Sequence, residues 1–231
     1  LLSESKFCAG CHFGVFGGVV GMNDVKDGVV IYNSYGEWLT SPYSDPKTGK
    51  TCQQCHMPTS TEKWFVLAEK GGLVRNDAEL HNHTMPGALD EKLLQNSVTM
   101  KTDAQRANNT IKVEVSITND QAGHDVPTDV PIRSMILVVE ALDANGKPLT
   151  LTEGSVNPDF SGDYSGVAGK TFAKVLKDQW TGESPTGAFW RPVTVVEDNR
   201  IAAMKTDTTS YTFAAPDNQA VTINVKLLYR R

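Results

Sequence analysis

The residues that could do chemistry in this sequence are its four cysteines and the histidines beside them. All four cysteines fall into two copies of one pattern, Cys8-Ala9-Gly10-Cys11-His12 and Cys52-Gln53-Gln54-Cys55-His56. Paired cysteines of this kind could hold a zinc ion, act as a thiol–disulfide redox motif, or attach a c-type haem. No cysteine is left over for a structural disulfide.

The zinc and thiol–disulfide interpretations each leave part of the pattern unexplained. Cysteine pairs of zinc sites usually lie roughly 15–20 residues apart, whereas Cys11 and Cys52 are much farther apart in the chain. Four thiolates would also complete a structural zinc site and leave both histidines without a role. A thioredoxin-like motif needs a βαβ context, and neither pair is flanked by one.

Covalent haem attachment accounts for every residue of the pattern. In a c-type cytochrome both thiols add to the vinyl groups of the haem, and the adjacent histidine becomes the proximal ligand of the iron. The sequence therefore predicts two covalently bound c-type haems. Each is held by two cysteines and one proximal histidine, which are Cys8, Cys11 and His12 for the first haem and Cys52, Cys55 and His56 for the second.

Each iron also has a sixth coordination position, for which the remaining histidines and some methionines are candidates. His81 and His83 share one turn-rich stretch, HNHTMPGA, and His124 lies in the loop AGHDVPT between two predicted strands. Met22 is an alternative for the first haem if His124 does not bind that iron, because Met22 follows the first motif on a glycine-rich segment. A second histidine closes the iron and keeps its potential low, methionine raises the potential, and an open position would invite catalysis.

The character of the sequence changes near residue 106. Residues 1–106 hold both motifs and little regular periodicity, with the best helix candidates at 35–41 and 88–98. Residues 107–231 contain several short segments with strand-like alternation, and Asn145-Gly146 predicts a hairpin turn there. We therefore expect an α+β chain, in which an irregular, helix-poor dihaem c-type segment precedes an antiparallel, immunoglobulin-like β-sandwich.

The clearest predicted strand is TIKVEVSITN (110–119). Its Ile111, Val113, Val115 and Ile117 recur with a period of two, which predicts that they face a core. A second segment with the same alternation, AVTINVKLLYR (220–230), lies near the end of the chain.

Charge and hydropathy exclude some classes of protein. The formal net charge is −5 and the pI is about 5.5. A nucleic-acid partner is not expected, because the sequence has no basic stripe. The longest apolar runs, such as residues 135–142, are far shorter than the roughly 20 residues that a helix needs to cross a bilayer. No transmembrane segment is therefore expected in this chain.

Four stretches of the sequence resemble a family of secreted multihaem cytochromes c. They are FCAGCH (7–12), YGEWLTSPYSDPKTGKTCQQCHMP (35–58), HNHTMPGA (81–88) and AGHDVPTDVPIR (122–133). In that family a haem-bearing segment precedes a β-sandwich-like C-terminal region. The resemblance implies electron transfer in the periplasm or at the cell surface. It also implies that His83 and His124 are distal ligands, with His81 spare or exchangeable.

Two features depart from the usual pattern of that family. PTD (127–129) stands where relatives usually have PTG, and many relatives carry more than two haems. A larger multihaem complex, self-association, or haem sharing between subunits therefore stays open.

Electron transfer between redox protein partners, outside the cytoplasm, is the function that the sequence favours. The charged residues near the motifs form no convincing set of general acids and bases, so an enzyme is less expected than an electron carrier. Two alternatives stay open. One is a haem oxidoreductase with one open iron that acts on a small inorganic substrate. The other is an electron-carrying structural subunit of a larger complex or a cytochrome polymer.

Overall fold

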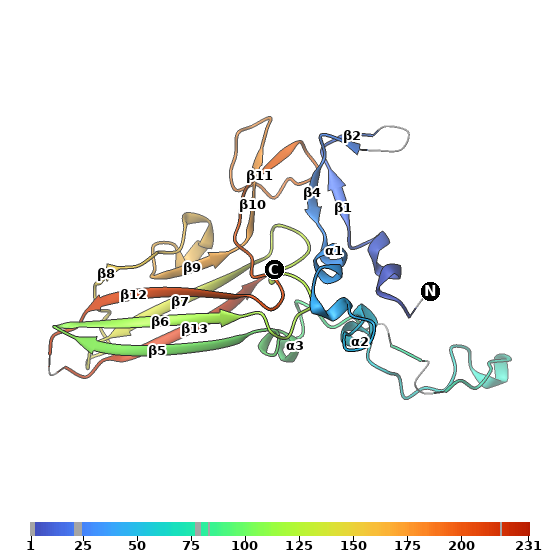
Figure 1. Ribbon diagram of the computed structural model, residues 1–231, viewed down its shortest axis with the longest axis horizontal. Helices are drawn as coiled ribbons and strands as arrows, with labels where there is room; N and C mark the ends of the chain where they lie inside the picture. The colour runs from blue at the N-terminus through green and yellow to red at the C-terminus, as the bar shows by residue number, and fades with distance from the viewer. Residues whose placement is uncertain (1–2, 21–24, 77–79, 83, 218) are drawn as a thin grey trace.

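The computed structural model describes residues 3–20, 25–76, 80–82, 84–217 and 219–231. The part of the chain before residue 99 contains only short elements (Figure 1). They are η1 (Ser5–Gly10), β1 (Gly14–Phe16), β2 (Val19–Val20), β3 (Val25–Lys26), β4 (Val29–Tyr32), α1 (Ser34–Leu39), η2 (Pro42–Ser44), α2 (Cys52–His56), η3 (Ala68–Lys70) and α3 (Glu91–Gln95). Within the described ranges, no helix is long and apolar enough to cross a membrane.

Longer strands dominate the rest of the chain. They are β5 (Thr99–Ala107), β6 (Thr110–Thr118), β7 (Ser134–Leu142), β8 (Leu151–Glu153), β9 (Gly169–Phe172), β10 (Lys174–Asp178), β11 (Val193–Asp198), β12 (Thr206–Ala214) and β13 (Thr222–Arg230), with the 3-10 turn η5 (Asp159–Tyr164) between β8 and β9. The predicted helix-poor, β-rich character of the chain is confirmed.

Two antiparallel sheets make up the C-terminal body. One has the strand order β5-β6-β12-β8 and the other has the order β13-β7-β9. Both run along the long axis of the molecule (Figure 1). Buried side chains from the two sheets belong to one hydrophobic cluster. Because each sheet buries one face against the other, this cluster is the main core of the protein.

The predicted inward face of residues 110–119 is confirmed. Val113, Val115 and Ile117 of β6 are at most 1% exposed, and Ile111 is 7% exposed. They pack with the fully buried Tyr211 of the neighbouring strand β12. Burying a side chain of this size stabilises the folded state by roughly 1.5–3 kcal/mol. The buried residues of β6 therefore contribute substantially to the stability of this sheet.

The predicted hairpin after β7 is only half right. The turn forms at Asn145-Gly146, where the N–H of Gly146 donates to Asp143 O at 3.0 Å and the φ of Gly146 is 78°. The residues after the turn begin to pair back with β7, through the bridge between Leu142 and Pro148 and a 2.8 Å hydrogen bond from the N–H of Leu149 to Ala141 O. The strand that follows, β8, does not continue along β7. It pairs with β12 and so joins the other sheet. Packing of the two sheets, rather than the local turn, decides the partner of β8.

The helix predicted at 88–98 is shorter than expected, since α3 covers only Glu91–Gln95. Asp90 caps it by accepting from the N–H of Leu93 at 2.8 Å. Leu89, inside the predicted helix range, is 80% exposed and lies before the cap. The first strand of the two large sheets, β5, begins at Thr99, upstream of the boundary expected at residue 106. The division into two domains stays a prediction.

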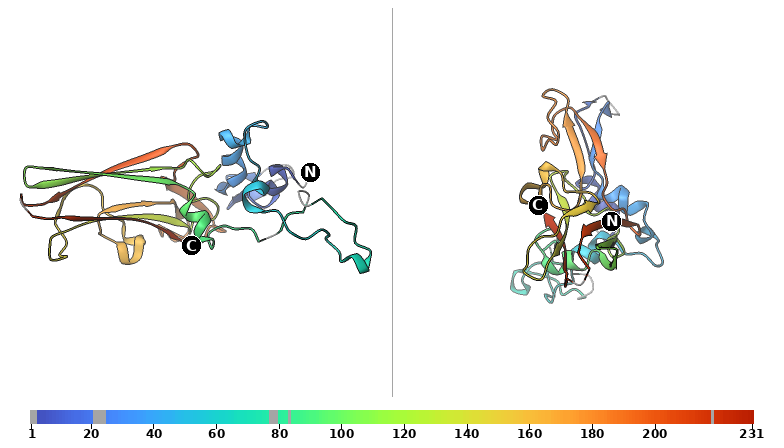
Figure 2. Two further views of the ribbon diagram at one scale, coloured as in Figure 1. Left: turned by 90° about the horizontal axis from the view of Figure 1, so that it is seen from below. Right: turned by 90° about the vertical axis from the view of Figure 1, so that its left-hand side faces the viewer.

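A small second core joins the two parts of the chain. The hairpin β10–β11 lies beside the N-terminal strands β1 and β4 (Figures 1 and 2). Ile31 of β4 is buried there against Leu176 and Val193. Phe16 and Phe189 pack edge-to-face beside them, with ring centroids 5.6 Å apart. The N-terminal elements are therefore fixed to the β-rich body by apolar contacts.

Candidate haem-binding site

The first cysteine motif lies on the 3-10 turn η1. This turn brings the backbone N–H groups of Cys11 and His12 to the carbonyl oxygen of Cys8, at 3.1 and 2.9 Å. Cys8 is half-buried and Cys11 is exposed, and neither forms a disulfide. Two thiols and one imidazole thus come from a single compact loop, as attachment to one macrocycle requires.

The second motif forms helix α2, and its N-terminal cap explains why so short a helix forms. The hydroxyl of Thr51 accepts from the N–H of Gln54 at 3.3 Å, and the side chain of Gln54 accepts from the N–H of Thr51 at 2.7 Å. This reciprocal capping box satisfies two N–H groups at the start of the helix. Helical spacing then places Cys52 and Cys55 on the same face, with His56 one residue farther on.

The two motifs are in direct contact. The N–H of Cys52 donates to the hydroxyl of Ser5 at 3.0 Å, and the side-chain amide of Gln53 donates to the carbonyl oxygen of Glu4 at 2.8 Å. The thiols of Cys8 and Cys52 also lie in hydrogen-bonding contact. The first thiol of each motif therefore belongs to the same small cluster, and two macrocycles attached here would be neighbours.

The surroundings of Cys8 and Cys55 favour the neutral form of each thiol. Burial raises the pKa of Cys8 to about 11, helped by the neighbouring Cys52 and Cys11. Burial likewise raises the pKa of Cys55, although the charge of Lys50 acts in the opposite direction. A thioether sulfur carries no charge, so the burial of these two sulfur atoms does not oppose covalent attachment of a haem. In the described residues, no group of three or more histidine, cysteine and acidic side chains is arranged to hold a metal ion.

The rings of His56 and His124 lie close together and nearly parallel. Their centroids are 6.2 Å apart and the ring planes are inclined by 17°. A metal bound between two imidazoles has bonds of about 2 Å to each nitrogen, and each nitrogen lies about 1 Å from its ring centre, which gives about 6 Å between centroids. The two side chains therefore fit opposite sides of one haem iron.

Backbone carbonyl groups orient both of these rings. Nδ1 of His56 donates to Pro86 O at 2.7 Å, and Nδ1 of His124 donates to Asp125 O at 2.9 Å. Both bonds fix the proton on Nδ1 and leave Nε2 as the coordinating nitrogen, which is the usual arrangement around metal-bound histidine. Burial lowers the pKa of His124, and the nearby charges of His56 and Arg200 lower it further. The imidazole is therefore held neutral, which is the form that binds iron.

Helix α1 holds the loop that carries His124. Glu37 of α1 accepts from the N–H of Asp125 at 3.2 Å and from the hydroxyl of Thr128 at 2.6 Å. The hydroxyls of Ser34 and Thr128 also form a hydrogen bond of 2.9 Å. Because α1 lies between the two cysteine motifs in sequence, it connects the segment that carries them to the histidine that the β-rich part supplies.

Arg200, which belongs to the β-rich part of the chain, also contacts Glu37 of α1. Its side chain is only 6% exposed and forms ion pairs of 2.8 Å with Glu37, 3.1 Å with Asp125 and 2.7 Å with Asp198. Burial and the charge of Glu37 raise the pKa of Asp125 to about 6, although Arg200 opposes this shift. One buried guanidinium thus balances several acidic groups beside the candidate iron ligand.

Aromatic side chains from the segment between the motifs pack on the same loop. A Cβ added to Gly123 would lie 3.0 Å from the Cβ of Tyr43 and 3.1 Å from a ring carbon of Trp38. The hydroxyl of Tyr43 also donates to Asp120 O at 3.0 Å. The residue before His124 must therefore be small, because two aromatic rings approach its backbone.

His12, the other predicted proximal ligand, has different surroundings. Its Nδ1 lies 3.8 Å from the carboxylate oxygen Oδ2 of Asp129, and the side chain of His12 is 42% exposed. The same oxygen lies 3.4 Å from Arg133. His12 thus has a charged neighbour at Nδ1, whereas His56 has a neutral carbonyl group.

The remaining ligand candidates have different outcomes. Nδ1 of His81 donates to Met57 O at 2.6 Å, so this half-buried ring is also oriented, beside the end of α2. His83 and Met22 lie outside the described residues. Which of these three completes the coordination of the first iron stays a prediction.

Sequence reasoning did not assign the residues that support the ligands. Glu37 lies in one of the four family-like stretches and Arg200 lies outside all of them, and no sequence pattern assigns a role to either residue. Asp129 stands where relatives usually have glycine, and it is one of the charged residues near the motifs that form no set of general acids and bases. A buried charge partner far away in the chain leaves no local signal in a single sequence.

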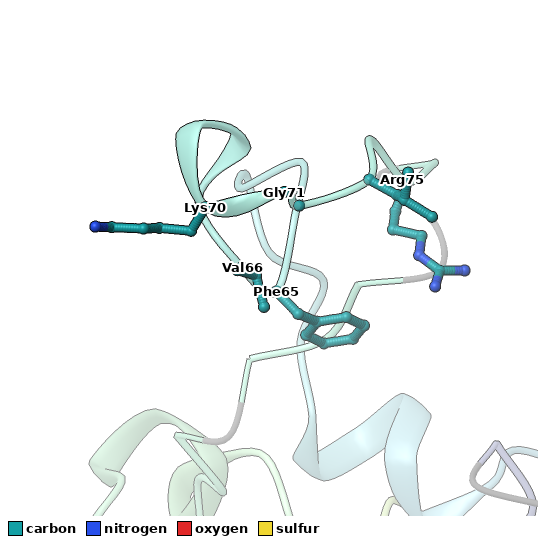
Figure 3. Close-up of a pocket in the computed structure, with 7 residues that line it drawn as sticks. Phe65, Val66, Lys70, Gly71 and Arg75 are labelled. Atoms are coloured by element: carbon teal, nitrogen blue, oxygen red, sulfur yellow. The ribbon is translucent and has the colours of Figure 1, made fainter.

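A separate cavity lies on the arm formed by residues 59–76, which extends away from the body (Figures 1 and 2). It encloses about 240 Å³ and is lined by Phe65, Val66, Lys70, Gly71, Gly72, Leu73 and Arg75 (Figure 3). The lining contains no cysteine or histidine, so this cavity is not the candidate haem site.

Comparisons with known proteins support the fold. No family model matches the sequence, and no curated protein matches it. The crystal structure of a penta-haem cytochrome c552 from Thermochromatium tepidum is similar, with a TM-score of 0.67 and 23% sequence identity. The match covers 99% of this chain and 49% of that one, so this chain spans about half the length of the solved protein. The chain therefore has a fold like that of a multihaem cytochrome c.

Proposed function

We propose that this chain is a dihaem c-type cytochrome that relays single electrons between redox protein partners outside the cytoplasm. The observation that carries the proposal is the pair of nearly parallel rings of His56 and His124, with centroids 6.2 Å apart and with both Nδ1 atoms bonded to backbone carbonyls. When bound, each haem supplies an iron that takes up and releases one electron.

The proposed ligand sets follow from the motifs and this ring pair. Cys52 and Cys55 hold one haem, with His56 and His124 on its iron. Cys8, Cys11 and His12 hold the other. The family resemblance implies that His83 is a distal ligand. With His124 on the other haem, we assign His83 to the iron of this first haem, with His81 or Met22 as alternatives. Two saturated irons would be closed to substrates and suited to electron transfer.

The arrangement of the chain supports a relay. The closeness of Cys8 and Cys52 would place the two haems near enough for rapid exchange of electrons. We assign residues 1–106 to the haem-bearing domain and residues 107–231 to an immunoglobulin-like sandwich that contributes His124. The family resemblance favours a periplasmic or extracellular location. Assembly into a larger multihaem complex is compatible with a chain that spans about half of its structural neighbour.

Mass spectrometry with a pyridine haemochrome assay tests the proposal. The protein, expressed with a c-type haem maturation system, should gain about 1.2 kDa, which is the mass of two haems. A Cys52→Ala/Cys55→Ala variant should gain half of that mass, and a matched Cys8→Ala/Cys11→Ala variant should do the same. A chain that gains no mass under these conditions would contradict the proposal and bring back the zinc interpretation.

Carbon monoxide separates the carrier from the oxidoreductase alternative. The reduced two-haem protein should not bind carbon monoxide, because both irons carry two protein ligands. A shifted Soret band on addition of the gas would instead reveal an open iron. Light scattering on the same sample tests the structural alternative, for which self-assembly into large species is the expected result.

A further inference from the structure

The two predicted proximal histidines have unequal neighbours at Nδ1. His56 donates to the uncharged carbonyl group of Pro86 at 2.7 Å. Nδ1 of His12 instead lies 3.8 Å from a carboxylate oxygen of Asp129. Because groups at this nitrogen control the basicity of a metal-bound histidine, the two irons should differ in electron affinity.

The backbone conformation of Asp129 is one that favours glycine over a residue with a charged side chain. Its φ is 73°, in the left-handed region that residues other than glycine rarely adopt. Aspartate tolerates this region better than most residues, but glycine would fit it without strain. The chain thus carries a charged side chain where its backbone geometry favours glycine.

The loop around Asp129 is rigid enough to hold the carboxylate in place. Val126 pairs with Ile201 through two backbone hydrogen bonds of 2.9 and 3.0 Å. Thr128, the residue before Asp129, donates to Glu37 at 2.6 Å. The loop that supplies His124 to one iron therefore also supplies Asp129 to the proximal histidine of the other.

Arg133 limits the effect of this charge. Its guanidinium lies 3.4 Å from the carboxylate oxygen that faces His12, and its side chain is 30% exposed. Arg133 also forms a hydrogen bond with Tyr229 on β13. His12, Asp129 and Arg133 thus form a row in which the cation partly compensates the carboxylate.

We propose that Asp129 is a positioning residue for His12, and that its carboxylate keeps the haem on Cys8 and Cys11 at a lower midpoint potential than the haem on Cys52 and Cys55. A negative charge beside the proximal imidazole stabilises the ferric iron more than the ferrous iron, because the ferric form carries the larger positive charge. This inference rests on the proposed function, since it requires both haems.

Redox titration of the two-haem protein, followed at the Soret band, tests the inference. Asp129→Asn keeps the shape of the side chain and tolerates the positive φ, but it removes the charge. At a fixed potential near the lower midpoint, the ratio of reduced to oxidised haem should rise about tenfold, which corresponds to 59 mV for one electron. The higher-potential wave should stay in place.

Two further variants test the direction of the shift in the lower midpoint potential and the role of the Asp129 charge. Asp129→Gly removes the carboxylate and the backbone strain together, so it should raise the lower wave as Asp129→Asn does, and should not lower the melting temperature. Arg133→Gln removes the compensating cation, so it should shift the lower wave in the opposite direction. The matched control is Asp163→Asn, which removes one exposed carboxylate from η5 and should move neither wave.

The outcomes distinguish this inference from the proposed function. Two unchanged waves in Asp129→Asn, or an equal shift of both waves, would overturn the inference while leaving a dihaem cytochrome intact. A protein without two attached haems would instead fail the mass measurement described above. A change in the ferric electron paramagnetic resonance g-values of only one haem in Asp129→Asn would support an altered His12, because these values report on the axial imidazole.

Discussion

At the scale of single residues, Asn119 holds together the two chain segments that position His124. Its side chain is fully buried at the end of β6. The amide group donates to His124 O and to Ile201 O, each at 2.8 Å, and its oxygen accepts from the N–H of Ala122 at 3.2 Å. One side chain thus satisfies three backbone groups around the candidate ligand.

Asn119→Ala should therefore lower the free energy of unfolding by about 2–4 kcal/mol, because buried backbone groups lose their partners. Urea unfolding of the haem-loaded protein measures this loss. The matched control is Asn96→Ala at the exposed end of α3, where the amide group donates to Lys92 O at 2.7 Å. This control should cost about 0.5 kcal/mol or less. Equal losses in both variants would contradict the role of Asn119.

At the scale of elements, α1 acts as the link between the haem-binding segment and the β-rich body. Glu37 contacts the backbone after His124, the hydroxyl of Thr128 and the guanidinium of Arg200. These partners lie far from α1 in the sequence. The helix has only two turns or fewer, so its stability comes from these contacts rather than from intrinsic propensity.

Glu37→Gln should destabilise the protein by about 1–3 kcal/mol. This is less than the 3–5 kcal/mol expected when a lone buried pair is broken, because Arg200 keeps Asp125 and Asp198 as partners. Thermal or urea unfolding measures the change. Glu62→Gln, an exposed glutamate on the arm, is the control and should leave stability within about 0.5 kcal/mol. A neutral result at Glu37 would show that α1 is not the link.

The elements also show which parts of the fold a sequence encodes locally. The alternation of β6 was predictable because every second residue of an antiparallel strand meets the same core. The turn at Asn145-Gly146 was predictable for a similar local reason. The pairing of β8 with β12 was not, because sheet packing decides it. The helix predicted at 88–98 is longer than α3, because the spacing of apolar residues does not show whether another part of the protein packs against them.

The candidate site divides in the same way. The cysteine spacing alone predicts that Cys8, Cys11, Cys52 and Cys55 attach the haems, because the pattern that this chemistry needs is local in the sequence. His124 could be nominated from its loop, but its proximity to His56 depends on how the β-rich body docks against α1. Glu37, Arg200 and Asp129 were not assigned, since their roles arise only when distant segments meet.

At the scale of the whole molecule, the β-rich body contributes a neighbour to the histidine of each cysteine motif. The β-rich body supplies His124 to one motif and Asp129 to the other. In the proposed dihaem cytochrome, the β-rich body is therefore part of the redox site. The chain also spans about half of its structural neighbour, a penta-haem cytochrome.

The central claim is that His56 and His124 bind the same iron. Electron paramagnetic resonance of the ferric His124→Gly protein tests it most directly, with and without added imidazole. We predict that one of the two haems becomes high-spin in this variant and returns to low-spin when imidazole occupies the vacated position. Two low-spin haems in His124→Gly without imidazole, as in the unmodified protein, would contradict the claim.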